Sequence, residues 1–393
     1  MRRSRMATGL ATALVVLSLG PAAARAQLMI VGNDQKPKFD AGQQTMLPPG
    51  HDTLSIIDMS KPAQLRMVAT IPLDNTIAGP PTNLAIAPKG DIALVANSLK
   101  AVEKEGKWQT EPDDRLFVVD LKANPPAIAA TLNLGKQPSG LAIDKTGTMA
   151  LVCNRADGSV SVLTIDGKAV KVTDTVTVGA AADSVSAVAI TPDGKTALAV
   201  KAAVDKVAVL TIDNGKVTYD KKNDLPANNY PYNVAVTPNG QIALVANTGN
   251  GGSSDGNVDS VSVVDLTATP IRIIDHITTG DSPEGLVISP NGGFAATIEA
   301  RGSNRPKDTW YYHPGGAASL FRIDGKKVTR VGEATVGALP EGAVFSADGS
   351  YLYVGNFIDS DLSVLRVTDG KLSDTGQRFK LPGQPASMRA GPQ

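Results

Sequence analysis

The stretch PTNLAIAPKGDIALVAN, residues 81–97, decides the fold of this chain. It contains a short apolar run, a Pro-Lys-Gly turn and a second apolar run ending in Asn, a pattern typical of two antiparallel strands joined by a tight turn. Similar stretches recur about 50 residues apart, which is room for four short strands and their loops. The first strand and turn of each copy lie in the segments 81–90, 138–147, 185–194, 230–240, 283–292 and 340–349.

Each copy is followed by two further runs that resemble strands, as at 160–165 and 260–265 in the second and fourth copies. A partial copy, 385–388, ends the chain, and segments 28–33 and 53–58 supply strands that it lacks. A ring closed by both ends of the chain leaves no exposed sheet edge. The sequence therefore predicts an all-β fold, a seven-bladed β-propeller of four-stranded blades, forming a single domain over residues 27–393.

Residues 1–26 have the pattern of a secretion signal, with basic residues near the start, an apolar run over 10–19 and the ending Ala24-Arg25-Ala26. The apolar run is shorter than the roughly 20 residues that span a bilayer. We expect cleavage before Gln27, a periplasmic or secreted protein, and no membrane anchor after cleavage.

Charge and cysteine content limit the possible functions. The 38 basic residues balance the 38 acidic ones, and four of the arginines lie in the predicted signal, so the mature chain is mildly acidic. Proteins that bind nucleic acids generally need a basic excess, so no general nucleic-acid binding is expected. Cys153 is the only cysteine, which excludes an intramolecular disulfide.

The second strands of several copies end in Leu-Val-Ala-Asn, Leu-Val-Cys-Asn or Leu-Tyr-Val-Gly-Asn, and a Ser-Val-x-x-x-Asp run follows in the fourth copy. In these motifs the chain resembles the YVTN-repeat β-propellers, a group that includes the lactonase-like propellers of the 6-phosphogluconolactonase type. The resemblance spans nearly all of the mature chain and implies the propeller fold. It also implies hydrolysis of a small lactone as one candidate activity.

In a propeller, loops entering each innermost strand and loops leaving each second strand meet at the mouth of the axial channel, a common place for ligands. Asn and Ser dominate these positions, where their simplest role is to satisfy turn backbone groups. The entering positions are Asn83, Ser139, Ser186, Asn233, Glu284, Glu341 and Ser387. The leaving positions are Asn33, Asn97, Asn154, Arg155, Lys201, Asn247, Glu299, Arg301 and Asn356.

From these positions the sequence suggests a ligand-binding set at the mouth, which His51 could approach from a long loop. The set is Asn83, Asn97, Asn154, Arg155, Asn233, Asn247, Glu284, Glu299, Arg301, Glu341, Asn356 and His51.

The fifth and sixth copies depart from the Asn/Ser pattern. Two Pro-Glu-Gly sequences contain Glu284 and Glu341, and an insertion over 302–316 carries aromatic residues and His313 beside Arg301. Carboxylates on a polar rim could activate water, which makes Glu284, Glu341, Arg301 and His313 the catalytic candidates. Glu284, Glu299 and Glu341 could instead bind a divalent cation such as Ca²⁺. In the simplest alternative, Glu284 and Arg301 form an ordinary ion pair and the aromatic residues fold the insertion over the ring.

Three functions remain open from the sequence. The first is a binding module that presents a small-molecule or protein site at the mouth, with insertions over 34–52, 98–115 and 302–316. The second is a lactone hydrolase in which Glu284 or Glu341 activates water and Arg301 or His313 stabilises the oxyanion. The third is a quinoprotein-like dehydrogenase subunit, ranked last because Trp108 and Trp310 are the only tryptophans.

Overall fold

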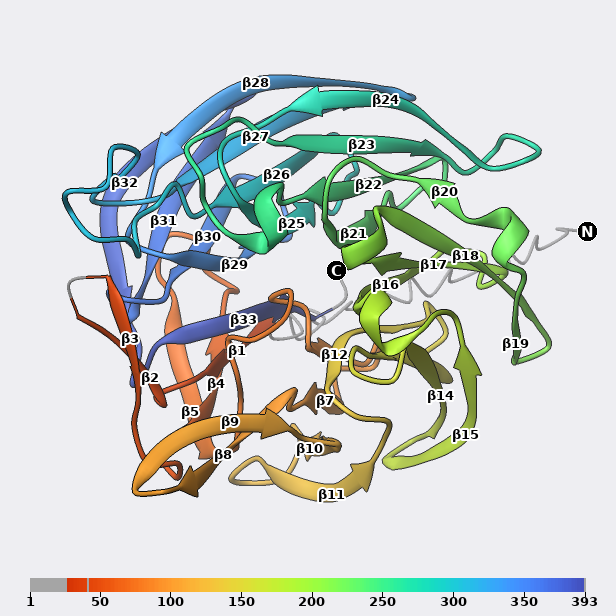
Figure 1. Ribbon diagram of the computed structural model, residues 1–393, viewed down its shortest axis with the longest axis horizontal. Coiled ribbons are helices and arrows are strands. Elements are labelled where there is room, and N and C mark those ends of the chain that lie inside the picture. Colours follow the sequence, from red (N-terminus) through yellow and green to blue (C-terminus); the bar gives the residue numbers. More distant parts are fainter. Residues whose placement is uncertain (1–26, 41, 392–393) are drawn as a thin grey trace, which may run out of the picture.

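In the computed structural model, which describes residues 27–40 and 42–391, seven four-stranded antiparallel sheets are arranged in a ring (Figure 1). Six sheets are built from consecutive strands, and the seventh combines the two ends of the chain. The predicted seven-bladed β-propeller is confirmed. The predicted signal, residues 1–26, lies outside the described residues.

We number the blades along the chain and list their strands from the channel outward. Blade 1 has β6 (Leu84–Ile86), β7 (Ile92–Ala96), β10 (Arg115–Asp120) and β11 (Ala127–Asn133). Blade 2 has β12 (Pro138–Ile143), β13 (Met149–Asn154), β14 (Ser159–Asp166) and β15 (Ala169–Thr177). Blade 3 has β16 (Val185–Ile190), β17 (Thr196–Lys201), β18 (Lys206–Asp213) and β19 (Lys216–Tyr219), and β20 (Leu225–Pro226) also pairs with β18.

Blade 4 has β21 (Pro231–Val236), β22 (Ile242–Asn247), β23 (Ser260–Asp265) and β24 (Arg272–Thr278). Blade 5 has β25 (Pro283–Ile288), β26 (Phe294–Glu299), β27 (Ala317–Asp324) and β28 (Lys327–Thr335). Blade 6 has β29 (Pro340–Phe345), β30 (Tyr351–Asn356), β31 (Asp361–Thr368) and β32 (Lys371–Lys380). Blade 7 has β33 (Pro385–Ala390), β1 (Leu28–Asn33), β4 (Thr53–Asp58) and β5 (Arg66–Pro72).

Blade 7 closes the ring as the sequence predicts. β33 from the C-terminal end pairs antiparallel with β1 from the N-terminal end, with Val31 opposite Met388. The other edge of β1 pairs with β4. The closure therefore ties both ends of the chain into one sheet and protects an edge that would otherwise be open to other chains.

Apolar side chains between neighbouring blades form the core. Seven separate clusters of buried residues each join two adjacent blades, for example Leu151 of blade 2 with Ala197 and Val188 of blade 3. Because each strand alternates its side chains between the two faces of its sheet, both faces of a blade take part in such clusters. This packing holds the inner strands in fixed positions around the axis.

Two hairpins and four short 3₁₀ turns are added to the blades. The hairpins are β2 (Pro37–Asp40) with β3 (Gln43–Met46), and β8 (Leu99–Lys104) with β9 (Lys107–Pro112). The turns are η1 (Ala181–Asp183), η2 (Ala202–Val204), η3 (Lys221–Asn223) and η4 (Asn250–Gly252). Within the part of the chain that the structure describes, no helix has the length and apolar character to cross a membrane.

Candidate functional site

The second residue of the innermost strands lies at a β-bulge. In blade 2, Pro138 pairs with Asn154 and the ladder resumes with Leu141 opposite Val152, so Ser139 has no ladder partner. Similar register shifts occur in blades 3 to 7. Bulges redirect side chains beside functional sites. The residues at this level are Thr82, Ser139, Ser186, Tyr232, Glu284, Glu341 and Ala386, which we call the mouth ring.

The register corrects the sequence alignment by one residue in three blades. Asn83, Asn233 and Ser387 each lie one position beyond the mouth ring. The side chain of Asn233 binds its surroundings at two points. Its Nδ2 donates to the Glu284 carbonyl at 3.2 Å, and its Oδ1 accepts from the Val234 backbone N–H. Asn83 likewise donates to the Ala96 carbonyl and to Asn75.

The asparagines that end the second strands connect strands within their own blades. Asn154 Nδ2 donates to Ser159 Oγ at 3.0 Å and to Ser161 Oγ at 2.9 Å. The same bonding recurs with other partners in four blades, at Asn33, Asn97, Asn247 and Asn356. These amides therefore join the second strand to the third.

Two blades replace this asparagine by a charged residue in an equivalent role. Glu299 is fully buried and its Oε1 accepts from the hydroxyls of Thr279 and Thr297. Lys201 is also buried and pairs with Asp183 at 3.1 Å and with Asp224 at 3.2 Å. The carboxylate of Glu299 is thus engaged by Thr297 of its own strand and by Thr279, which follows the last strand of blade 4.

Arg301 does not pair with Glu284, so the simple ion pair suggested by the sequence is wrong. Its guanidinium pairs instead with Glu333 on β28, at 3.1 Å, near the outer edge of blade 5. His313 is exposed, and its Nδ1 lies 3.0 Å from the Tyr311 carbonyl and 3.2 Å from the Arg301 carbonyl. His51 is exposed as well, with its carbonyl accepting from the Gln35 side chain.

Arg155, by contrast, reaches from blade 2 toward the first strand of blade 4. Its Nε donates to Ser184 Oγ at 2.6 Å and its Nη2 donates to Tyr230 Oη at 3.2 Å. The guanidinium carbon lies 5.7 Å from the centre of the Tyr232 ring, and that ring stacks on Tyr230 with centroids 6.1 Å apart. A guanidinium held by two hydroxyls and an aromatic face is fixed in orientation.

Glu284 and Glu341 belong to the same electrostatic cluster. Burial raises the pKa of Glu284 to about 7, against the opposing effect of the Arg155 charge. Burial, followed by the charge of Glu284, raises the pKa of Glu341 well above its ordinary value. Tyr232 interacts with Arg155 and both glutamates, and burial keeps its phenol protonated by raising its pKa.

The side chains of Arg155, Tyr232, Glu284 and Glu341 come from blades 2, 4, 5 and 6. Because side chains from separate blades interact here, they lie near the axis of the ring. We call Arg155, Tyr232, Glu284 and Glu341 the mouth cluster. Burial raises the pKa of both carboxyl groups, and the charge of Glu284 raises that of Glu341 further, so the two groups do not ionise independently. Neighbouring carboxyl groups with raised pKa values are suited to act as acid and base.

Glycine permits the close packing that this cluster needs. A Cβ on Gly285, the residue after Glu284, would lie 2.3 Å from the Glu341 carbonyl oxygen. Such a contact is too short for any side chain. The Pro-Glu-Gly sequences therefore place each glutamate beside a residue that lets inner strands of blades 5 and 6 approach.

Some polar atoms of the mouth ring are buried and have no protein partner. They are Thr82 Oγ1, Ser139 Oγ and Glu341 Oε2. Buried polar atoms normally have a hydrogen-bond partner, and unsatisfied ones commonly mark a place for a ligand. Glu341 is only 1% exposed, so its free carboxyl oxygen faces the protein interior.

The insertions cover one side of this mouth. Phe39 on β2 contacts the Phe357 ring edge to face, with centroids 6.1 Å apart, and both pack in a cluster with Ala386 of the mouth ring. A Cβ on Gly42 would lie 2.2 Å from the Pro306 nitrogen, so the β2–β3 hairpin touches the 302–316 insertion. Trp310 in that insertion is 79% exposed and stacks edge to face on Tyr311.

Glu284, Glu299 and Glu341 do not assemble as cation ligands. Across residues 27–40 and 42–391, no three His, Cys, Asp or Glu side chains come together in a metal-binding arrangement. Glu299 is engaged with two threonines, and Arg155 adds a positive charge next to Glu284. That charge opposes the approach of a divalent cation.

Sequence reasoning found Arg155, Glu284 and Glu341 but missed Tyr230 and Tyr232. A stricter alignment on the proline that begins most inner strands would have found Tyr232, because it follows Pro231 as Glu284 follows Pro283. The contact of Arg155 with Tyr230 leaves no such signal, since it joins loops of different blades.

Comparison with known proteins supports the fold. No family model and no curated protein sequence matches the chain. Among solved structures, the periplasmic gluconolactonase of Pseudomonas aeruginosa superposes with a TM-score of 0.67 at 17% identity, covering 93% of this chain and 99% of that one. A proposed 6-phosphogluconolactonase from Bacteroides fragilis gives 0.66 at 15% identity, over 94% and 99% of the two chains.

A dihydro-heme d1 dehydrogenase also matches, with a TM-score of 0.56 at 16% identity over 93% of this chain and 66% of that chain. At these identities the likeness concerns the fold. The chain is thus a seven-bladed β-propeller, as its repeats suggest, and it shares this fold with the two lactonase structures.

Proposed function

We propose that the mouth cluster binds a small lactone and opens its ring with water. The observation that carries this proposal is the pair Glu284 and Glu341, two carboxyl groups near the axis whose pKa values are both raised, next to the fixed guanidinium of Arg155. The resemblance to lactonase-like propellers supports the same reaction class.

The reaction assigns one role to each group. Ionised Glu284 takes a proton from water as the oxygen of that water attacks the lactone carbonyl carbon. The Arg155 guanidinium and the Tyr232 hydroxyl stabilise the negative charge that develops on the carbonyl oxygen. Glu341, which is protonated, donates its proton to the ring oxygen as the acyl C–O bond breaks. The product is one hydroxy acid, and a proton passes from Glu284 to Glu341 or solvent before the next cycle.

The charges favour a substrate without a phosphate group. The mouth cluster contains one guanidinium and two carboxyl groups, whereas phosphate recognition usually draws on several cations or backbone N–H donors. We therefore propose an unphosphorylated lactone. Most mouth-ring residues are buried, but Glu284 is partly exposed, so a substrate can meet the proposed base from solvent.

A binding module remains the second candidate, favoured by the unpartnered atoms Thr82 Oγ1, Ser139 Oγ and Glu341 Oε2. These would hold a polar small molecule without chemistry. In both cases we propose that the protein acts in the periplasm or outside the cell, since residues 1–26 have the pattern of a secretion signal and one structural neighbour is described as periplasmic.

The test is acid release from a panel of γ- and δ-lactones, measured by pH-stat with purified mature protein. Hydrolysis that is lost in Glu284→Gln and retained in Glu333→Gln supports the lactonase, because Glu333 is an exposed glutamate of the same blade. Binding of a lactone without acid release, weakened by Glu341→Gln, would instead favour the binding module. If all variants hydrolyse equally, the proposed role of the mouth cluster is wrong.

A further inference from the structure

The lower end of the axial channel, opposite the mouth ring, is lined by small apolar side chains. The fifth residue of each inner strand lies three positions beyond the mouth ring, about 10 Å along the strand. In blades 1 to 6 this residue is Ala85, Ala142, Ala189, Ala235, Val287 and Val344. In blade 7 it is Arg389.

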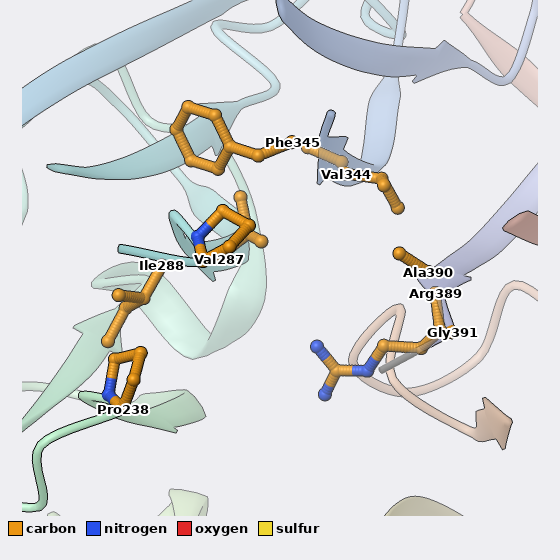
Figure 2. Close-up of a pocket in the computed structure, with 10 residues that line it drawn as sticks. Pro238, Val287, Ile288, Val344, Phe345, Arg389, Ala390 and Gly391 are labelled. Atoms are coloured by element: carbon orange, nitrogen blue, oxygen red, sulfur yellow. The ribbon is translucent and has the colours of Figure 1, made fainter. Parts of the chain in front are cut away.

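Arg389 lines two neighbouring cavities at this end, with volumes of about 400 Å³ and about 340 Å³. Val287 and Ile288 also line both cavities. Figure 2 shows the guanidinium of Arg389 extending into the space in front of Ile288 and Pro238. Volumes of this size are within the usual range of small-molecule sites.

No described carboxylate neutralises the charge of Arg389. Among residues 27–40 and 42–391, no carboxylate forms an ion pair with this partly buried guanidinium. Asp144, which lines the larger cavity, instead accepts hydrogen bonds from Thr146 and from the backbone of Thr148 and Met149. Burial lowers the pKa of Arg389 to about 10, so the group stays charged at neutral pH.

An unpaired charge in apolar surroundings destabilises a folded protein, and an anion that pairs with it recovers part of that cost. We propose that the lower end of the channel binds a small organic carboxylate with an apolar body, of the size of a medium-chain fatty acid. The carboxylate accepts two parallel hydrogen bonds from Arg389, and the apolar body lies against the alanine and valine side chains. A phosphate dianion fits less well, because the cavity linings are mainly apolar and Arg389 and Lys145 are their only cationic members among the described residues.

The proposal is tested with octanoate and purified mature protein, by isothermal titration calorimetry and thermal unfolding. The uncharged 1-octanol and inorganic phosphate serve as comparison ligands. Arg389→Met keeps the apolar volume and removes the charge, and Arg366→Met makes the same change at an exposed position on β31. We expect octanoate to bind the parent and the Arg366→Met protein alike, and at least about tenfold more weakly to Arg389→Met.

A second variant tests the cavity without touching the arginine. Ala235→Phe fills the channel wall, and we expect it to abolish octanoate binding while thermal unfolding shows a folded protein. The proposal is overturned if octanoate at about 10 mM does not bind the parent, or if it binds Arg389→Met as tightly as the parent. It is also overturned if 1-octanol or phosphate binds as well as octanoate, since the site would then not select for both charge and apolar body.

Discussion

The asparagines at the ends of the second strands, here called the leaving ring, and the mouth ring differ in what their buried polar groups do. The leaving asparagines, such as Asn154 and Asn356, donate their amide hydrogens to hydroxyl and carboxylate groups of the adjacent strand, while the side-chain oxygens of Asn33, Asn97, Asn154 and Asn247 are buried without a partner. In the mouth ring, Glu341 is buried with an unpartnered oxygen, and burial together with the charge of Glu284 raises its pKa. The leaving ring joins strands within blades, whereas the mouth ring contains buried titratable groups that cost stability, as binding and catalytic sites commonly do.

The strongest way to break this comparison is to remove the proposed base. Glu284→Gln should lower kcat/KM for lactone hydrolysis by about 10²- to 10⁴-fold, the usual contribution of a general base. Steady-state rates by pH-stat measure the loss. Equal rates in Glu284→Gln and the parent would move the chemistry away from the mouth cluster.

Replacing the guanidinium should have the next largest effect. Arg155→Met should lower kcat by about 10²-fold through loss of charge stabilisation on the oxyanion. Because the Arg155 charge lowers the pKa of Glu284, the residual activity should also rise with pH through a midpoint above about 7. A pH–rate profile whose midpoint does not move would contradict contact between these two groups.

Substitution of an asparagine in the leaving ring should lower the stability of the protein and leave its activity intact. Asn154→Ala leaves two hydroxyls without their donor and should lower the free energy of unfolding by about 1–3 kcal/mol. Denaturant unfolding measures this change, with Asn257→Ala at an exposed loop position as control. A large loss of kcat in a folded Asn154→Ala protein would show that this asparagine belongs to the site.

A substitution in the mouth cluster should instead raise the stability of the protein. Glu284 has its pKa raised from 4.5 to about 7, so the folded protein binds more protons than the unfolded chain between these values. Stability contributed by the protonated form is therefore present below about pH 4.5 and is lost as the pH rises to about 7. Glu284→Gln should remove this loss and stabilise the protein by about 1–3 kcal/mol at pH 8 relative to the parent.

Thermal unfolding of both proteins at pH 4.5 and pH 8 gives the comparison. The difference in melting temperature should be small at the lower pH and favour the variant at the higher one. If the variant is less stable at pH 8, Glu284 is held by interactions that the cluster described above does not contain.

Removal of divalent cations should have the smallest effect. Lactone hydrolysis should continue unchanged in EDTA, because the positive charge of Arg155 beside Glu284 disfavours a cation at the mouth. A loss of activity in EDTA that Ca²⁺ restores would return Glu284 and Glu341 to the role of metal ligands.

Much of the fold could be predicted because it is encoded locally and repeated. The turn and strand pattern of residues 81–97 recurs in six copies, and the apolar segments 28–33 and 53–58 had no other blade to complete, so the ring closure followed. The bulge at each inner strand was not visible in one sequence. The alignment therefore placed Asn233 where the structure has Tyr232.

The site could be predicted only in part, because its contacts join distant blades. Glu284 and Glu341 were evident as departures from an Asn/Ser pattern, but the partner of Arg301 depends on how β28 lies beside the loop after β26. Arg389 was overlooked because its column of alanines and valines is apparent only when the inner strands are aligned by their observed register.

The most direct test of the mouth cluster is the titration of its two carboxyl groups by ¹³C NMR in protein labelled at the glutamate side-chain carboxyl carbon. Signals are assigned by their absence in Glu284→Gln and Glu341→Gln. The account predicts one carboxyl that titrates near pH 7 and is missing in Glu284→Gln, and another that titrates well above 4.5 and is missing in Glu341→Gln. Two carboxyl groups that both titrate near the ordinary value of 4.5 would contradict it.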